Sequence, residues 1–256
     1  MTFKTTAYLL VLIVCCPFTN NTVFGGVVFD ATTDFSTASN GTGAWRYSWS
    51  NDTSRDGNYE LFGQTGPLGT GPGSGSPVWH ADAGAPTAQR PYLGINTTGE
   101  LDGSTWQQGE LGFHPGQSGG GTDPSMAILT FTSPITGFAN IIFDIEMGLN
   151  GNISWFIDQN TDAGNLASGS MSSISETASF SIADLWVNKN DNLNFIVASN
   201  GNPGSDLVVI KQAQIELNAV PEPSSAMLVI FFLGTIGIYR YWSESLRLNS
   251  RLATTP

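Results

Sequence analysis

Aromatic side chains carry the most distinctive chemistry in this sequence. Trp45, Tyr47 and Trp49 alternate along one segment, so an extended chain places all three rings on one face. Such a row forms a flat platform for the apolar C–H faces of sugar rings, and an amide such as Asn96 can hydrogen-bond to the sugar hydroxyls. A buried stripe of core side chains explains the same row and is the simpler interpretation.

Three other aromatic residues stand among glycines, prolines and polar side chains in the first half of the chain: Trp79, Tyr92 and Trp106. This composition is typical of surface loops. We therefore expect these rings to be exposed, which makes them better candidates for sugar stacking than the alternating row.

Carboxylates and histidines offer the chemistry of catalysis. Asp144 and Glu146 share one face of an expected strand, and glycoside hydrolases use such carboxylate pairs, although two solvated side chains explain the pair as well. The only histidines are His80 and His114, and no metal-binding spacing is present, so the sequence does not predict a zinc enzyme. His114 precedes Pro115, which favours a turn histidine bonded to backbone groups over an acid or base.

Turns supply the remaining metal-binding chemistry. Asp191 and Asp206 lie in or near asparagine-rich turns, and their hard oxygens suit a structural calcium ion. Turn formation alone accounts for the same residues. The sequence thus predicts no metal centre and no cofactor, with calcium as the alternative.

Most of the sequence alternates apolar and polar residues in short runs, the period of half-buried strands. The expected strands are 27–35, 44–50, 127–132, 141–147, 153–158, 180–187, 193–199 and 207–217. Turn residues separate these runs. The pattern predicts one all-β domain, a β-sandwich of jelly-roll type. The Gly- and Pro-rich segment 63–77 should be a surface loop.

The N-terminus has the pattern of a signal peptide. Lys4 precedes an apolar run, 7–16, that ends at Pro17, and cleavage is expected near Gly25 or Gly26. The signal therefore spans 1–25 and the mature domain 26–219. Both cysteines fall inside the signal, so the domain has no disulfide.

The acidic composition narrows the partners of the exported domain. The chain of 256 residues has a formal net charge of −12. Such a surface repels nucleic acid and anionic lipid, and it suits neutral glycans or divalent cations. Solubility in an external medium also explains the charge.

The C-terminus carries a second targeting signal. Prolines hold the glutamate of a short motif in an extended, accessible conformation, and an apolar run follows that predicts a transmembrane helix at about 225–242. The motif residues are Val220, Pro221, Glu222, Pro223 and Ser224. This tail, 220–256, resembles the PEP-CTERM sorting signal of exported Gram-negative proteins.

The resemblance implies a route and a set of partners. The export machinery would deliver the chain, the helix would anchor a precursor in the inner membrane, and an exosortase, a membrane protease, would process the tail. The protein would then reach the cell surface or extracellular matrix, where exopolysaccharide is a partner.

The domain also resembles an uncharacterised group of exported β-sandwich proteins. The matching residues are Trp79 and the segments 43–49, 59–62, 93–99 and 112–116, which include a Trp-rich strand, an Asn-Thr-Thr-Gly segment and a His-Pro-Gly turn. The resemblance implies a sandwich similar to carbohydrate modules and no particular activity. We therefore expect a non-enzymatic surface protein, which either binds carbohydrate or is purely structural. The alternatives are a glycan-active hydrolase or lyase, and an ice-binding protein.

Overall fold

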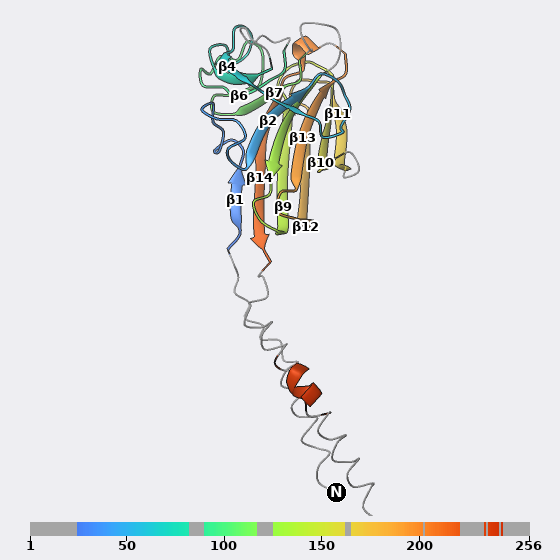
Figure 1. The fold of residues 1–256 in the computed structure, drawn as a ribbon. Coiled ribbons are helices and arrows are strands. Elements are labelled where there is room, and N and C mark those ends of the chain that lie inside the picture. The colour runs from blue at the N-terminus through green and yellow to red at the C-terminus, as the bar shows by residue number, and fades with distance from the viewer. Residues whose placement is uncertain are drawn as a thin grey trace, which may run out of the picture.

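The computed structural model describes residues 25–81, 90–116, 125–161, 165–201, 203–220, 233, 235–240 and 242. Within them the domain is built from two antiparallel sheets that pack face to face (Figure 1). The prediction of an all-β sandwich is confirmed. The jelly-roll connectivity stays a prediction.

The larger sheet has eight strands. Its order is β12 (Thr177–Val187), β9 (Gly137–Met147), β14 (Val208–Ala219), β7 (Leu111–His114), β6 (Tyr92–Ile95), β5 (Pro77–His80) and β4 (Gln64–Pro67). β14 pairs with β7 through residues 208–210 and with β1 (Val27–Asp30) through residues 214–217. Val27 lies opposite Leu217, so the domain begins and ends at the same end of the sandwich (Figure 1).

The smaller sheet has six strands. Its order is β11 (Asn165–Met171), β10 (Ile153–Gln159), β13 (Asn192–Ser199), β8 (Met126–Thr132), β2 (Trp45–Ser50) and β3 (Glu60–Leu61). A short 3-10 turn, η3 (Pro203–Ser205), precedes β14. Every strand expected from the alternating pattern is present, because one apolar face of each strand packs into the core between the sheets.

The expected surface loop at 63–77 is wrong in part. Residues 64–67 form β4, and Leu68 and Ser76 are buried. β4 pairs with β5 alone, at the edge of the larger sheet, where glycine and proline are tolerated because one side of the strand needs no partner.

The expectations for the two termini lie mostly outside the described residues. These are the signal peptide, 1–25, the motif residues 221–224 and much of the tail. Residues 233, 235–240 and 242 are helical. Across the part of the chain that the structure describes, no helix has the length and apolar content needed to cross a membrane.

A second, smaller core covers the outer face of β5, β6 and β7. Its buried side chains are Leu68, Val78, Tyr92, Trp106, Leu207 and Val209. His114, at the end of β7, is also buried here, and its ring stacks on Tyr92 with centroids 5.0 Å apart. Neither of its ring nitrogens has a hydrogen-bond partner among the described residues, so the expectation of a turn histidine bonded to backbone groups is wrong. Burial lowers the pKa of His114 to about 3, so the imidazole is neutral in the folded protein.

His114 should make the fold sensitive to acid. The folded protein keeps this imidazole neutral, whereas in the unfolded chain it takes up a proton near pH 6.5. Its contribution to stability should therefore fall as pH drops from 6.5 toward 3, by up to about 1.4 kcal/mol per pH unit. Denaturant unfolding of the full chain at several pH values measures this effect. As the pH falls, the free energy of unfolding should decrease less steeply for His114→Phe, which leaves His80 in place, than for the wild type. Equal slopes for the two proteins would contradict the burial of a neutral His114.

Candidate functional site

The alternating aromatic row faces the core. Trp45 and Tyr47 are 4% and 2% exposed, and Trp49 is half-buried against the same cluster. The ring of Trp45 packs edge-to-face on Phe131 at 5.2 Å. The interpretation as a core stripe is therefore confirmed, and the row offers no platform to a sugar.

The exposure predicted for the three loop aromatics is wrong. Trp79, Tyr92 and Trp106 are 7%, 1% and 0% exposed. Trp79 donates its indole N–H to the carbonyl of Ser36 at 2.7 Å. Trp79 and Tyr92 lie on β5 and β6 of the larger sheet, where one ring packs into the main core and the other into the second core. Trp106 does lie in a loop, and this loop folds back onto the sheet and buries the ring.

Glycines make the space that Trp106 occupies. A Cβ added to Gly112, on β7, would lie 2.7 Å from the indole, and one added to Gly73 would lie 2.5 Å from it. Gly73 also has a φ of +70°, a conformation that side chains disfavour. The indole is thus locked between a strand and a turn, so stacking on a sugar would require the loop to open.

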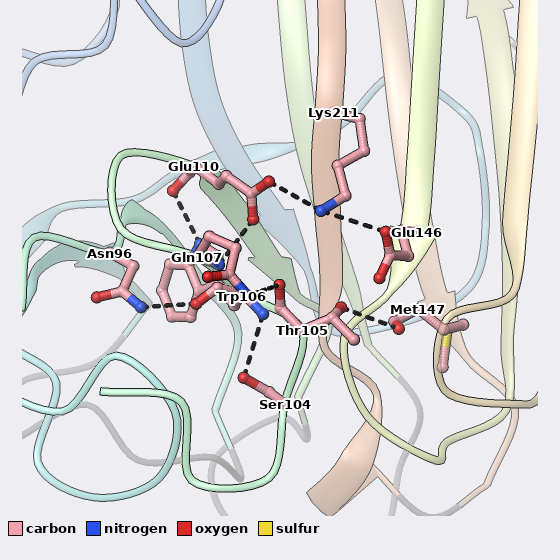
Figure 2. A network of polar contacts seen from close by, with 9 residues as sticks. All are labelled: Asn96, Ser104, Thr105, Trp106, Gln107, Glu110, Glu146, Met147 and Lys211. Carbon is pink, nitrogen blue, oxygen red and sulfur yellow. Dashed lines mark hydrogen bonds and ion pairs between the residues drawn. The ribbon is translucent and has the colours of Figure 1, made fainter. Parts of the chain in front are cut away.

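Asn96 is equally occupied, as Figure 2 shows. Its amide nitrogen donates to the carbonyl of Trp106 at 2.8 Å, and its oxygen accepts from the backbone N–H of Gly99 at 2.9 Å. Asn96 is fully buried. It closes the loop 96–110 and presents nothing to a ligand.

A charged network fastens the same loop to the larger sheet (Figure 2). Lys211 of β14 contacts Glu110 at 2.8 Å and Glu146 of β9 at 3.2 Å. Burial by itself would lower the pKa of Lys211, but its hydrogen bonds to the two carboxylates raise that pKa overall. Glu146 and Asp144 lie on the outer face of the larger sheet, where both are half-buried. The side chain of Glu146 is 16% exposed and is paired with Lys211, so the interpretation of two solvated carboxylates does not hold for it.

The two calcium candidates are not brought together. Asp191 lies in the turn before β13 and accepts from the backbone N–H of Asn188 at 2.8 Å. Asp206 is buried near the other end of β13, where it bonds to the hydroxyl of Ser199 and the backbone N–H of Asn152. Among the described residues, no group of three or more acidic, histidine or cysteine side chains is placed to hold a metal.

The structure instead shows a polar groove on the outer face of the smaller sheet. Its cavity volume is about 200 Å³. The pairing of three neighbouring strands sets one row of its floor, in which Asn194, Thr130 and Arg46 lie side by side. Asp158 continues this row on β10 but is not among the residues that line the groove. The residues that line it are Arg46, Ser48, Gly57, Tyr59, Leu61, Thr130, Asn160, Thr161, Asn192 and Asn194. We call this the outer groove.

Hydrogen bonds from side chains to other side chains and to the backbone hold the floor of the outer groove. Thr130 donates to the amide oxygen of Asn194 at 2.8 Å, and the amide nitrogen of Asn194 donates to the carbonyl of Asn160 at 2.8 Å. Asn160 in turn accepts from the backbone N–H of Asn192 at 2.9 Å. The polar groups are therefore held in place before any ligand arrives.

The segment 51–59 forms one wall of the outer groove. One nitrogen of Arg55 reaches both oxygens of Asp158, at 2.8 and 2.9 Å, and the guanidinium lies 4.2 Å above the ring of Phe156. Tyr59 packs beside Phe156 on the apolar cluster of β8 and β13. At its tip the wall meets the turn after β10, because Gly57 lies against Thr161.

Tyr59 leaves a polar atom unsatisfied at this site. Its hydroxyl oxygen is shielded from solvent and has no hydrogen-bond partner within the described part of the chain. Burial, followed by the charge of Asp158, raises the pKa of Tyr59 to about 12, so the group stays a neutral hydroxyl. A buried hydroxyl without a partner costs about 1–3 kcal/mol. Because the oxygen is shielded from solvent, a ligand group could bond to it only if the segment 51–59 shifted to admit that group.

None of the residues that line the outer groove was predicted from the sequence to bind a glycan. The signal was present in the same alternation that revealed the strands, since the polar positions between core residues in β2, β8 and β13 form its floor. Nothing in the sequence showed that these three strands are neighbours. Tyr59 lies in a segment where no strand or site was expected.

A second exposed feature lies on the outer face of the larger sheet. Phe138 and Trp186, paired across β9 and β12, are 39% and 44% exposed. Their rings meet edge-to-face at 5.1 Å. This aromatic pair is the alternative place for a sugar to stack.

Comparisons with known proteins leave the ligand open. No protein-family model matches the chain, and neither does any curated protein. Among solved structures, it is similar to CBM51 from Clostridium perfringens GH95 in complex with methyl-galactose, with 13% identity over 74% of this chain and 99% of that one, at a TM-score of 0.33. It is similar to TmCBM61 in complex with β-1,4-galactotriose, with 14% identity over 43% and 70%, at a TM-score of 0.27.

A likeness of the same order joins the chain to the Eiger TNF of S. frugiperda, with 10% identity over 78% of this chain and 98% of that one, at a TM-score of 0.24. All three TM-scores lie below 0.5, so none of these likenesses supports a ligand for this chain. The assignment of the site therefore rests on the outer groove itself.

The burial of Trp106 predicts a large stability effect. Trp106→Ala should lower the free energy of unfolding by about 3–5 kcal/mol, because it empties a fully buried site. The matched control is Trp186→Ala, which removes a ring that is 44% exposed and should cost much less. Denaturant unfolding of both full-length variants measures the difference. Similar small losses would show that the loop 96–110 does not bury this ring.

Proposed function

We propose that the chain is an exported, non-enzymatic β-sandwich protein that binds a glycan in the outer groove. The observation that carries this proposal is the lining of the groove, which is made mainly of amides and hydroxyls and includes the Tyr59 side chain. Sugar hydroxyls both donate and accept hydrogen bonds, so they match a lining of this kind. The fixed positions of Thr130 and Asn194 add to the match, since they lose little freedom on binding.

The size of the outer groove limits what it can hold. Its volume of about 200 Å³ is below the range of roughly 300–1,000 Å³ typical of pockets that enclose a whole small molecule. The groove is therefore suited to one or two sugar residues of a longer chain. A surface protein that holds a polysaccharide needs no more than this.

The lining of the outer groove favours binding over hydrolysis. None of its residues is a carboxylate, whereas glycoside hydrolysis ordinarily uses two carboxyl groups that flank the bond. Asp144 and Glu146 lie on the other sheet, and Glu146 contacts Lys211. The hydrolase and lyase alternatives thus have no supporting arrangement among the described residues.

The C-terminal tail bears on where the protein is delivered. Val220 is exposed at the end of β14, where it leads into the motif of Glu222 and the apolar run. In this proposal the run holds the precursor in the inner membrane, and an exosortase processes the chain near Glu222 to release the domain to the surface. What supports it is the sequence of the tail.

Removing the Tyr59 hydroxyl should separate stability from binding. Tyr59→Phe deletes a buried group for which the described residues offer no partner, so the variant should be as stable as the wild type or up to about 1–3 kcal/mol more stable. Its affinity for the bound glycan should nevertheless fall several-fold. A glycan array on the purified full-length chain identifies the glycan, and isothermal titration then compares the two proteins.

The exposed aromatic pair supplies the control for this experiment. Trp186→Ala leaves the outer groove untouched, and it should keep wild-type affinity. If Trp186→Ala abolished binding and Tyr59→Phe did not, the site would belong on the larger sheet. If no glycan bound the wild type, the proposal would fail as a whole.

Glu222 provides the test of sorting. Glu222→Ala removes the one charge of the motif and leaves the apolar run intact, so the variant should accumulate in the membrane fraction unprocessed. Glu244→Ala, a carboxylate of the same tail outside the motif, should be released like the wild type. Immunoblots of membrane and extracellular fractions from the native host measure both. Equal release of Glu222→Ala and the wild type would show that the motif is not a sorting signal.

A further inference from the structure

The outer groove has a charge opposite to that of the protein. The chain has a formal net charge of −12, yet Arg46 is the only ionised side chain among the residues that line the groove. The nearest carboxylate in the same row of the sheet, Asp158, is held by Arg55. A ligand in the groove therefore meets one positive charge and no opposing negative one from its lining.

Arg46 differs from the cations that fasten one part of the domain to another. Arg55 and Lys211 both form ion pairs with carboxylates. For the guanidinium of Arg46, no described residue provides a hydrogen bond or an ion pair, and the side chain is exposed. Its stem passes beside Gly41, where an added Cβ would lie 3.6 Å from the Cγ of Arg46.

The position of Arg46 suits a specific kind of ligand. Its neighbour across the strand pair is Thr130, whose hydroxyl is fixed by Asn194. A planar guanidinium presents paired N–H donors that match the two oxygens of a carboxylate. A sugar that carries a carboxylate could therefore bind Arg46 through its acid group. Its hydroxyls would then lie near the asparagine amides and the Tyr59 side chain that also line the groove.

We propose that the outer groove selects acidic glycans, those whose sugars bear a carboxylate, with Arg46 as the specificity-determining residue. This inference rests on the proposed glycan-binding function and narrows it to a substrate class. The acidic protein surface would otherwise repel such chains, so a local cation is what makes this recognition feasible. Binding should weaken as salt screens the exposed charge.

Matched probes test the charge alone. The full-length chain is titrated with oligogalacturonate and with its methyl ester, which has the same rings without the charge, and an array pairs other acidic oligosaccharides with their carboxyl-reduced forms. The neutral member of a pair cannot form the charge-assisted hydrogen bond to Arg46. The acidic member should therefore bind about tenfold more tightly than the neutral one. In Arg46→Gln this ratio should fall to about one, with affinity for the neutral member unchanged.

Two further variants make the outcome decisive. Lys189→Gln removes an exposed cation that does not line the groove, and it should keep the preference of about tenfold. Tyr59→Phe should weaken both members of each pair and leave their ratio intact. Preference for the neutral members, equal binding of both, or a preference that survives in Arg46→Gln would overturn the inference and leave glycan binding standing. Binding of neither member of any pair would overturn both proposals.

Discussion

The ion pair between Arg55 and Asp158 is the interaction on which the outer groove depends. Asp158 projects from the outer face of β10 and its side chain is 1% exposed, so removing Arg55 would take the ion-pair partner from a buried carboxylate, at a cost of about 3–5 kcal/mol. The same guanidinium covers Phe156. One side chain thus holds the segment 51–59 against the sheet, and Tyr59 with it.

The pattern of the sequence predicted the second half of the domain better than the first. β9 is long and alternates throughout, and β14 alternates after its first three residues, because one face packs in the core and the other meets solvent. β5, β6 and β7 have four residues each and are buried on both faces, so they show no alternation. Their outer cover comes from Leu68 and Trp106, in the loops next to these strands, and from Leu207 and Val209 at the start of β14. Trp106 is buried in this cover, although its neighbours in the sequence are those of a loop residue.

Site prediction failed for a related physical reason. Aromatic rings are the strongest local signal of sugar binding, but a domain without disulfides needs large apolar side chains for its core, and this domain uses Trp45, Trp79 and Trp106 in that way. The outer groove is lined mostly by polar side chains that form a site only because strand pairing brings them together. Thr130 lies between Arg46 and Asn194 because β8 lies between β2 and β13.

The most direct test of this account is an NMR titration of the isotope-labelled full-length protein with the glycan that binds best. The outer groove predicts that the largest shifts fall on the amides of Arg46, Thr130 and Asn194, together with Tyr59. Shifts confined to Trp186 and Phe138, or to the loop around Trp106, would contradict it, because each lies on the outer face of the other sheet.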